Sequence, residues 1–142
     1  MLLATGLFAT AILSARSHTD LNGTWALQPT DSNFNGQPVM QTGTVTINER
    51  QGDITVSRDF TYEGAKETFF YKDMIDSENN ATIHGGDVKS KARWDHDVLK
   101  VTTTTPAGAV TVERYWLAAN GTMTVNVDKP GSKPITLVFV RK

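Results

Sequence analysis

Apolar and polar residues alternate along most of the chain after Asn22, in short stretches separated by clusters of Gly, Asn, Asp and Pro. A two-residue period places successive side chains on opposite faces of a strand, whereas a helix repeats its apolar positions every three or four residues. No convincing helical pattern interrupts the alternation. The sequence therefore predicts a series of half-buried antiparallel strands.

Ten strands are predicted from this alternation. They cover residues 24–28, 44–50, 53–60, 67–72, 81–84, 87–95, 98–105, 109–118, 122–128 and 135–141. Pairs such as Gln51-Gly52, Gly85-Gly86 and Asn120-Gly121 lie between them and tolerate a positive φ, as tight hairpins require. Consecutive strands are therefore expected to pair, and residues 29–41, rich in Asn, Gly and Pro, are expected to form a loop.

Two segments indicate which faces are buried. In 87–95 one face is charged, and the other carries Val88, Ser90, Ala92 and Trp94. In 109–118 Glu113 and Arg114 occupy opposite faces, so one of them points inward.

The last predicted strand, 135–141, is apolar on both faces, which is typical of a central or closing strand. Many short strands without a covering helix would leave two open edges, and closure removes them. The fold predicted is all-β: an up-and-down meander closed into a barrel of about 8–10 strands. A β-sandwich is the alternative.

The N-terminal segment has a different pattern. An apolar run from Leu2 to Leu13 is followed by small residues around Ser17, which is typical of a signal peptide. The run is shorter than the roughly 20 apolar residues of a transmembrane helix. We therefore expect a signal peptide over 1–17, a barrel domain over 18–142, and a secreted or periplasmic protein. The alternative is that residues 1–17 are retained as a packing element.

Composition narrows the function classes. The 142 residues carry a net charge of -1, so no strong field attracts nucleic acid or an acidic membrane surface. The chain has no cysteine, which excludes disulfides, thiolate metal sites and cysteine nucleophiles. The fold must be stabilised by packing alone.

A family resemblance rests on the segment Leu21-Asn22-Gly23-Thr24-Trp25. This Gly-x-Trp at the head of the first strand resembles the opening motif of the lipocalins and the wider calycin group. The resemblance implies that Arg141, near the C-terminus, packs across Trp25 and closes the barrel base. The mature chain is also similar to small exported lipocalin-like bacterial proteins, which are mostly uncharacterised.

Three members of the calycin group fit less well. Fatty-acid-binding proteins place two helices between their first two strands, and the 29–41 loop is too rich in helix breakers to supply them. Avidins surround biotin with several tryptophans, whereas only Trp94 and Trp116 remain here besides Trp25. Nitrobindins carry a glycine-rich motif after their tryptophan, and this chain lacks it. None of these activities is transferred.

Candidate chemistry is sparse. His84 and Asp87 are weak metal-ligand candidates in a predicted turn, and no metal or cofactor is predicted. Asp73 and Asp76 would form an acid-base pair only if both faced inward. Since no catalytic motif appears, an enzyme is the less favoured class.

We expect an exported protein that binds a small apolar or amphipathic ligand inside the barrel, because such a barrel is wide enough to hold one. The ligand-lining candidates are Phe70, Ser90, Ala92, Trp94, Arg114, Tyr115 and Trp116. An inward Arg114 would either pair within the protein or bind an acidic head group. The alternatives are a structural module that self-associates through sheet edges or a retained N-terminal segment, and an uncharacterised enzyme.

Overall fold

A computed structural model describes residues 18–83 and 86–142 and contains ten β-strands and one short 3₁₀ helix. The elements are, in chain order, β1 (Gly23–Leu27), η1 (Pro29–Asp31), β2 (Met40–Arg50), β3 (Asp53–Tyr62), β4 (Ala65–Met74), β5 (Glu78–Ile83), β6 (Gly86–Asp95), β7 (Val98–Thr104), β8 (Val110–Leu117), β9 (Met123–Asp128) and β10 (Ile135–Arg141). The predicted all-β class and antiparallel meander are confirmed. No helix in the described residues has the length and apolar character needed to span a membrane.

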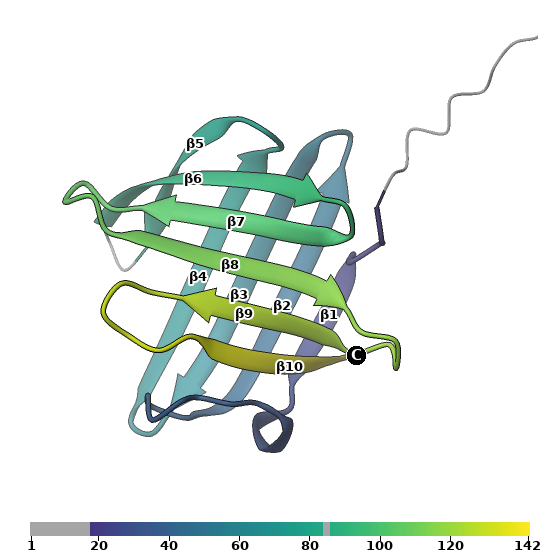
Figure 1. The fold of residues 1–142 in the computed structure, drawn as a ribbon, viewed down its shortest axis with the longest axis vertical. Coiled ribbons are helices and arrows are strands. Elements are labelled where there is room, and N and C mark those ends of the chain that lie inside the picture. The colour runs from purple at the N-terminus through teal and green to yellow at the C-terminus, as the bar shows by residue number, and fades with distance from the viewer. Residues whose placement is uncertain (1–17, 84–85) are drawn as a thin grey trace, which may run out of the picture.

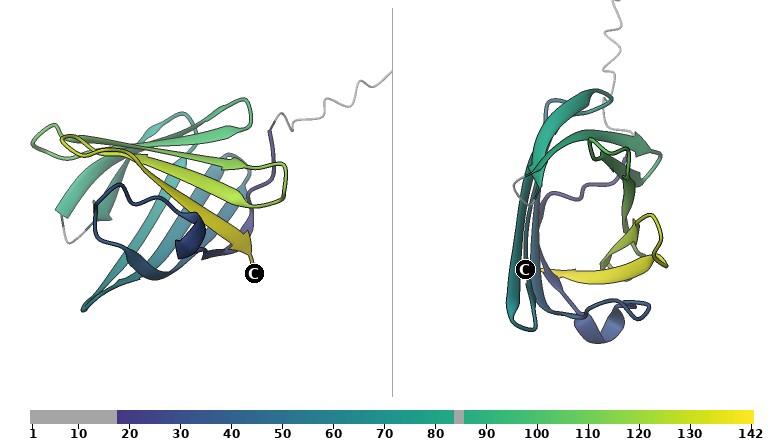
Figure 2. Two further views of the ribbon diagram at one scale, coloured as in Figure 1. Left: turned by 60° about the horizontal axis from the view of Figure 1, so that its bottom comes forward. Right: turned by 90° about the vertical axis from the view of Figure 1, so that its left-hand side faces the viewer.

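The strands close into a barrel in which each strand pairs with its chain neighbours and β1 also pairs with β10. Strands β6–β10 form one wall and cross the strands of the other wall steeply (Figure 1). Seen from the side, the two walls enclose the interior, and η1 lies beneath it (Figure 2). The continuous ring of pairing excludes the sandwich alternative.

Pairing is uneven around the ring. β3 and β4 pair along their full length, whereas among the described residues β4 and β5 share one paired position, Phe70 with Thr82. β5 also lacks a buried residue. The sheet is therefore weakest between β4 and β5.

Hairpin turns use the expected residues. Gln51 and Gly52 both have positive φ, at 53° and 86°, which matches the right-handed twist of the flanking strands β2 and β3. Gly121 has φ 84° before β9. Gly85 lies outside the described residues.

Two strands start three or more residues earlier than predicted. β2 begins at Met40 rather than at 44, so the loop before it is shorter, because Met40 is buried and pairs with Tyr62 beside a register irregularity. β5 begins at Glu78 rather than at 81 and pairs with β6 through backbone groups. Both extensions consist largely of polar residues, so apolar alternation does not predict them.

The core consists of apolar side chains inside the barrel. Its largest fully buried side chains include Trp25, Ile54, Tyr71, Leu99, Tyr115, Met123, Leu137 and Phe139. They come from both walls and join one apolar cluster. Some members of this cluster, such as Phe60 and Leu137, also line the cavity that forms the candidate site.

Candidate functional site

A cavity of about 310 Å³ lies at the end of the barrel that carries the β3–β4, β5–β6, β7–β8 and β9–β10 turns. Its apolar wall consists of Met40, Phe60, Phe69, Ile83, Val88, Val127, Ile135 and Leu137. Its polar wall consists of Arg58, Tyr62, Glu67, Thr103, Thr105, Thr111, Glu113 and Lys129. A hollow that combines apolar side chains with polar groups is typical of a small-molecule site.

An ion pair between Arg58 and Glu113 lies in the wall of this cavity. Arg58 is only 7% exposed and Glu113 only 3%. Arg58 Nη2 donates to Glu113 Oε1 at 2.7 Å, and Arg58 Nη1 donates to Glu113 Oε2, so the contact is bidentate. Such a pair fixes both side chains and cancels their charges.

Aromatic rings surround the guanidinium of Arg58. Its Cζ lies 5.3 Å from the ring centre of Phe69 and 5.6 Å from that of Tyr71. Both distances allow cation–π attraction. The rings shield one side of the ion pair from water.

Two tyrosine hydroxyls extend the polar network. Tyr115 donates to Glu113 Oε2 at 3.3 Å, and the hydroxyls of Tyr71 and Tyr115 are 3.3 Å apart. Because Tyr115 uses its hydrogen for Glu113, Tyr71 must be the donor in the contact between the two tyrosines. Glu113 therefore determines which hydroxyl is the donor in each of these two hydrogen bonds.

Burial and charge shift the pKa values of these groups. Burial alone would lower the pKa of Arg58, but the neighbouring Glu113 carboxylate raises it well above its usual value. Burial raises the pKa of Tyr71 and of Tyr115, although the positive charge of Arg58 opposes this. All three groups therefore keep their protons at neutral pH.

Two buried polar atoms of the described residues lack a hydrogen-bond partner, one beside the cavity and one farther along the barrel. Within the described part of the chain, Arg58 Nε and Asp73 Oδ1 are buried without a hydrogen-bond partner. Asp73 accepts a hydrogen bond from Ser90 at 2.6 Å through its other oxygen. Burial raises the pKa of Asp73, while the hydrogen bond from Ser90 opposes the shift.

Asp73 and Asp76 do not form the acid-base pair considered from the sequence. Asp73 is fully buried on β4, whereas Asp76 is exposed in the following turn with φ 65°. The two side chains lie on opposite sides of the barrel wall, so they cannot share a proton.

Three of the seven predicted ligand-lining residues face the interior but lie outside the cavity wall. Ser90, Ala92 and Tyr115 are all buried. Tyr115 is connected to the cavity wall only through its hydrogen bond to Glu113. The predicted face of β6 is correct, but periodicity does not report depth along the barrel axis.

Three other predicted residues lie on the outer face of the barrel. Phe70 is 59% exposed, because its neighbours Phe69 and Tyr71 take the inward positions of β4. Arg114 and Trp116 share the outer face of β8, since Glu113 and Tyr115 are the buried residues there. The inward arginine considered at 114 is therefore corrected: the inward member of that pair is Glu113, and the inward arginine is Arg58.

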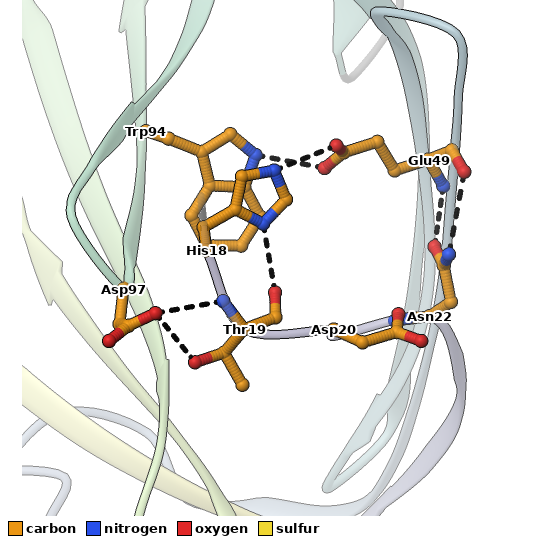
Figure 3. A network of polar contacts seen from close by, with 7 residues as sticks. All are labelled: His18, Thr19, Asp20, Asn22, Glu49, Trp94 and Asp97. Atoms are coloured by element: carbon orange, nitrogen blue, oxygen red, sulfur yellow. Dashed lines mark hydrogen bonds and ion pairs between the residues drawn. The ribbon is translucent and has the colours of Figure 1, made fainter. Parts of the chain in front are cut away.

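Trp94 belongs to a polar network at the opposite end of the barrel (Figure 3). His18 stacks on Trp94 with ring centroids 3.7 Å apart and an interplanar angle of 8°. Glu49 accepts from Trp94 Nε1 at 2.8 Å and lies 3.0 Å from His18 Nε2. The sequence analysis assigned no role to His18.

The same segment also forms hydrogen bonds with the β6–β7 turn and with β2. The backbone nitrogen and hydroxyl of Thr19 both donate to Asp97 Oδ1 at 2.8 Å (Figure 3). These hydrogen bonds lower the pKa of Asp97. Asn22 exchanges side-chain hydrogen bonds with the backbone of Glu49. Residues 18–22 therefore cover this end of the barrel.

Trp25 and Arg141 close the barrel base as the resemblance implied. Trp25 is fully buried, and the Cζ of Arg141 lies 4.3 Å from its ring centre. Gly23 has φ 131°, and a Cβ there would lie 2.8 Å from Arg141 Nη1. The glycine of the Gly-x-Trp motif therefore leaves room for the arginine.

His84 and Asp87 were the weak metal candidates. His84 lies outside the described residues, and Asp87 is exposed at the start of β6. In the described ranges 18–83 and 86–142, no group of three or more His, Cys, Asp or Glu residues is arranged to hold a metal ion.

Arg58 is the main residue that the sequence analysis missed. It continues the inward row Ile54, Val56 and Phe60 of β3, all buried. An arginine in an otherwise apolar row of a strand predicts a buried cation, and a buried cation needs a partner. That signal was present in the sequence and was not used.

Comparisons with known proteins place this barrel among solved structures. The sequence matches no known protein family and no curated relative. A Schistosoma mansoni fatty acid binding protein in complex with arachidonic acid is similar, with TM-score 0.67, 18% identity, and 89% of this chain and 99% of that chain covered. The chain has the fold of the fatty-acid-binding proteins.

Two further solved structures agree. The REP1-NXSQ fatty acid transporter has TM-score 0.67, 17% identity, and coverage of 86% of this chain and 96% of that chain. The fluorescent protein UnaG has TM-score 0.66, 19% identity, and coverage of 86% and 97%. The helix pair of fatty-acid-binding proteins is replaced here by η1 and extended chain between β1 and β2.

Proposed function

We propose that this protein binds a small, largely apolar molecule in the cavity beside Arg58 and Glu113. The observation that carries the proposal is the cavity of about 310 Å³ with an apolar wall and a buried, bidentate ion pair at its side. An interior meant only for stability would be filled by side chains, because each void costs packing energy. Two of the structurally similar proteins are named for fatty acids, which supports the same use of the fold.

A filled-cavity variant tests the proposal. Thr103 lies in the cavity wall on β7 and is 9% exposed, while its neighbour Thr102 faces outward. Thr103→Phe would occupy the cavity, and Thr102→Phe adds the same ring to the outer face. We expect the neutral fluorescent probe N-phenylnaphthylamine to bind the wild type and Thr102→Phe, and to bind Thr103→Phe at least roughly tenfold more weakly. Equal binding by all three proteins would reject this cavity as the site.

The proposal includes export of the protein. Its support is the apolar run from Leu2 to Leu13 and the small residues that follow. Expression of the full chain in a bacterium, followed by mass measurement of the protein in the periplasm and medium, tests it. A cytoplasmic protein of full-length mass would contradict export and leave the binding proposal intact.

A further inference from the structure

We propose that the cavity selects a neutral amphipathic ligand, with a hydroxyl or carbonyl head group, over a long-chain carboxylate. This inference rests on the binding function proposed above and specifies its ligand class. The observation behind it is that the buried cation already has an anion: both Glu113 oxygens accept from Arg58.

The charges of the cavity wall sum to zero. Arg58 and Lys129 supply two positive charges, and Glu67 and Glu113 supply two negative charges. A ligand carboxylate beside Arg58 would therefore be attracted by the guanidinium and repelled by Glu113 over similar distances. Little net attraction remains to offset the cost of removing the carboxylate from water. A neutral head group avoids that cost.

A carboxylate could bind Arg58 strongly only by displacing Glu113. Glu113 is only 3% exposed, so a displaced Glu113 carboxylate would lie unpaired inside the barrel. Tyr115 also donates to it, which holds the carboxylate in place. The protein's own anion is therefore pre-positioned, whereas the ligand's anion must be brought out of water.

The remaining polar groups of the wall suit a neutral head group. The side chains of Thr103, Thr105 and Thr111 contribute hydroxyl groups to the same wall. These groups donate to or accept from a hydroxyl or carbonyl without adding a charge.

Cavity size sets the scale of the ligand. At about 30 Å³ per water-sized group, a volume of about 310 Å³ holds a saturated chain of roughly ten methylene groups. Decanol, decanoate and decylamine have this size and differ mainly in head-group charge. They form the matched probe series.

The experiment measures displacement of N-phenylnaphthylamine from the wild-type protein by each probe at neutral pH. We expect decanol to displace it with an affinity roughly tenfold or more above that of decanoate and of decylamine. Decanoate binding as tightly as decanol would overturn this inference and leave the binding function standing. Absence of binding by N-phenylnaphthylamine and by all three probes would overturn the proposed function itself.

Removing the internal anion should reverse the selectivity. Glu113→Gln leaves Arg58 charged and unpaired, so decanoate is expected to gain roughly tenfold or more relative to decanol. Glu78→Gln makes the same change on an exposed position of β5 and should keep the wild-type preference. If a folded Glu113→Gln protein keeps that preference, the ion pair does not set selectivity. The wild-type series decides the inference if the variant does not fold.

Discussion

Arg58 and Glu113 are 55 positions apart in the chain, lie on the non-adjacent strands β3 and β8, and form a bidentate ion pair inside the barrel. Because both side chains are buried, neither charge is compensated by water. The pair therefore links the two walls of the barrel and makes each residue depend on the other.

Breaking this pair on one side should be more destabilising than replacing both partners. Arg58→Met and Glu113→Leu each leave a buried charge unpaired, and each is expected to cost about 3–5 kcal/mol of unfolding free energy. The double variant should lose less than the sum, because no uncompensated charge remains. Urea denaturation of the four proteins measures the coupling. Additive losses would show that the two charges are screened independently, contrary to their burial.

The tyrosines should resist alkaline ionisation. The chain has three, Tyr62, Tyr71 and Tyr115. Burial, together with the charge of Glu67 and a hydrogen bond to it, raises the pKa of Tyr62 to about 12, and burial raises those of Tyr71 and Tyr115. Tyrosinate absorbance should therefore not appear near pH 10, the usual tyrosine value, until the protein unfolds.

The sign of the stability effect follows from these shifts. Tyrosinate is disfavoured in the folded state, so the unfolding free energy falls as pH rises above the unfolded tyrosine pKa of about 10. The same titration in concentrated urea supplies the control and should show all tyrosines ionising at the usual value. Native titration near pH 10 with retained circular dichroism would contradict the burial of these hydroxyls.

Asp73 should make the protein less stable as the solution becomes less acidic. Its pKa is raised by burial, so the protonated form is favoured in the folded state. The associated loss of unfolding free energy begins at the unfolded Asp pKa of about 3.9 and is complete above the raised folded value. Asp73→Asn should therefore gain stability relative to wild type as pH rises from about 4 to 7.

Urea denaturation of both proteins across this pH range measures the difference. Asp87→Asn removes one carboxylate from an exposed position and controls for the change in net charge. A constant difference between Asp73→Asn and wild type at all pH values would show that Asp73 titrates alike in both states.

The two ends of the barrel should act independently. His18 contacts Trp94 and Glu49 at the end opposite the cavity, so His18→Ala should leave N-phenylnaphthylamine affinity within about twofold. The partly exposed contacts should contribute about 1 kcal/mol or less to stability. In an NMR spectrum, the Trp94 indole N–H signal should shift in this variant. A loss of affinity comparable to that of Thr103→Phe would show that the ends are coupled.

Much of the fold was determined by the sequence itself. Strict two-residue alternation in 87–95 placed Val88, Ser90 and Ala92 on the inner face, and that prediction is correct. The pairs Gln51-Gly52 and Asn120-Gly121 predicted the hairpins that make neighbouring strands pair. Local backbone preferences and period alone carry this information.

Only the tertiary structure decided which face of an all-aromatic segment points inward and which residues far apart in the chain come into contact. On β4, Phe69, Phe70 and Tyr71 are all aromatic, so alternation could not tell which of them point inward. The pairing of Arg58 with Glu113 depends on how strands that do not neighbour each other face across the interior. Periodicity specifies two faces of each strand, but barrel closure and the depth of each residue along the axis are properties of the whole ring.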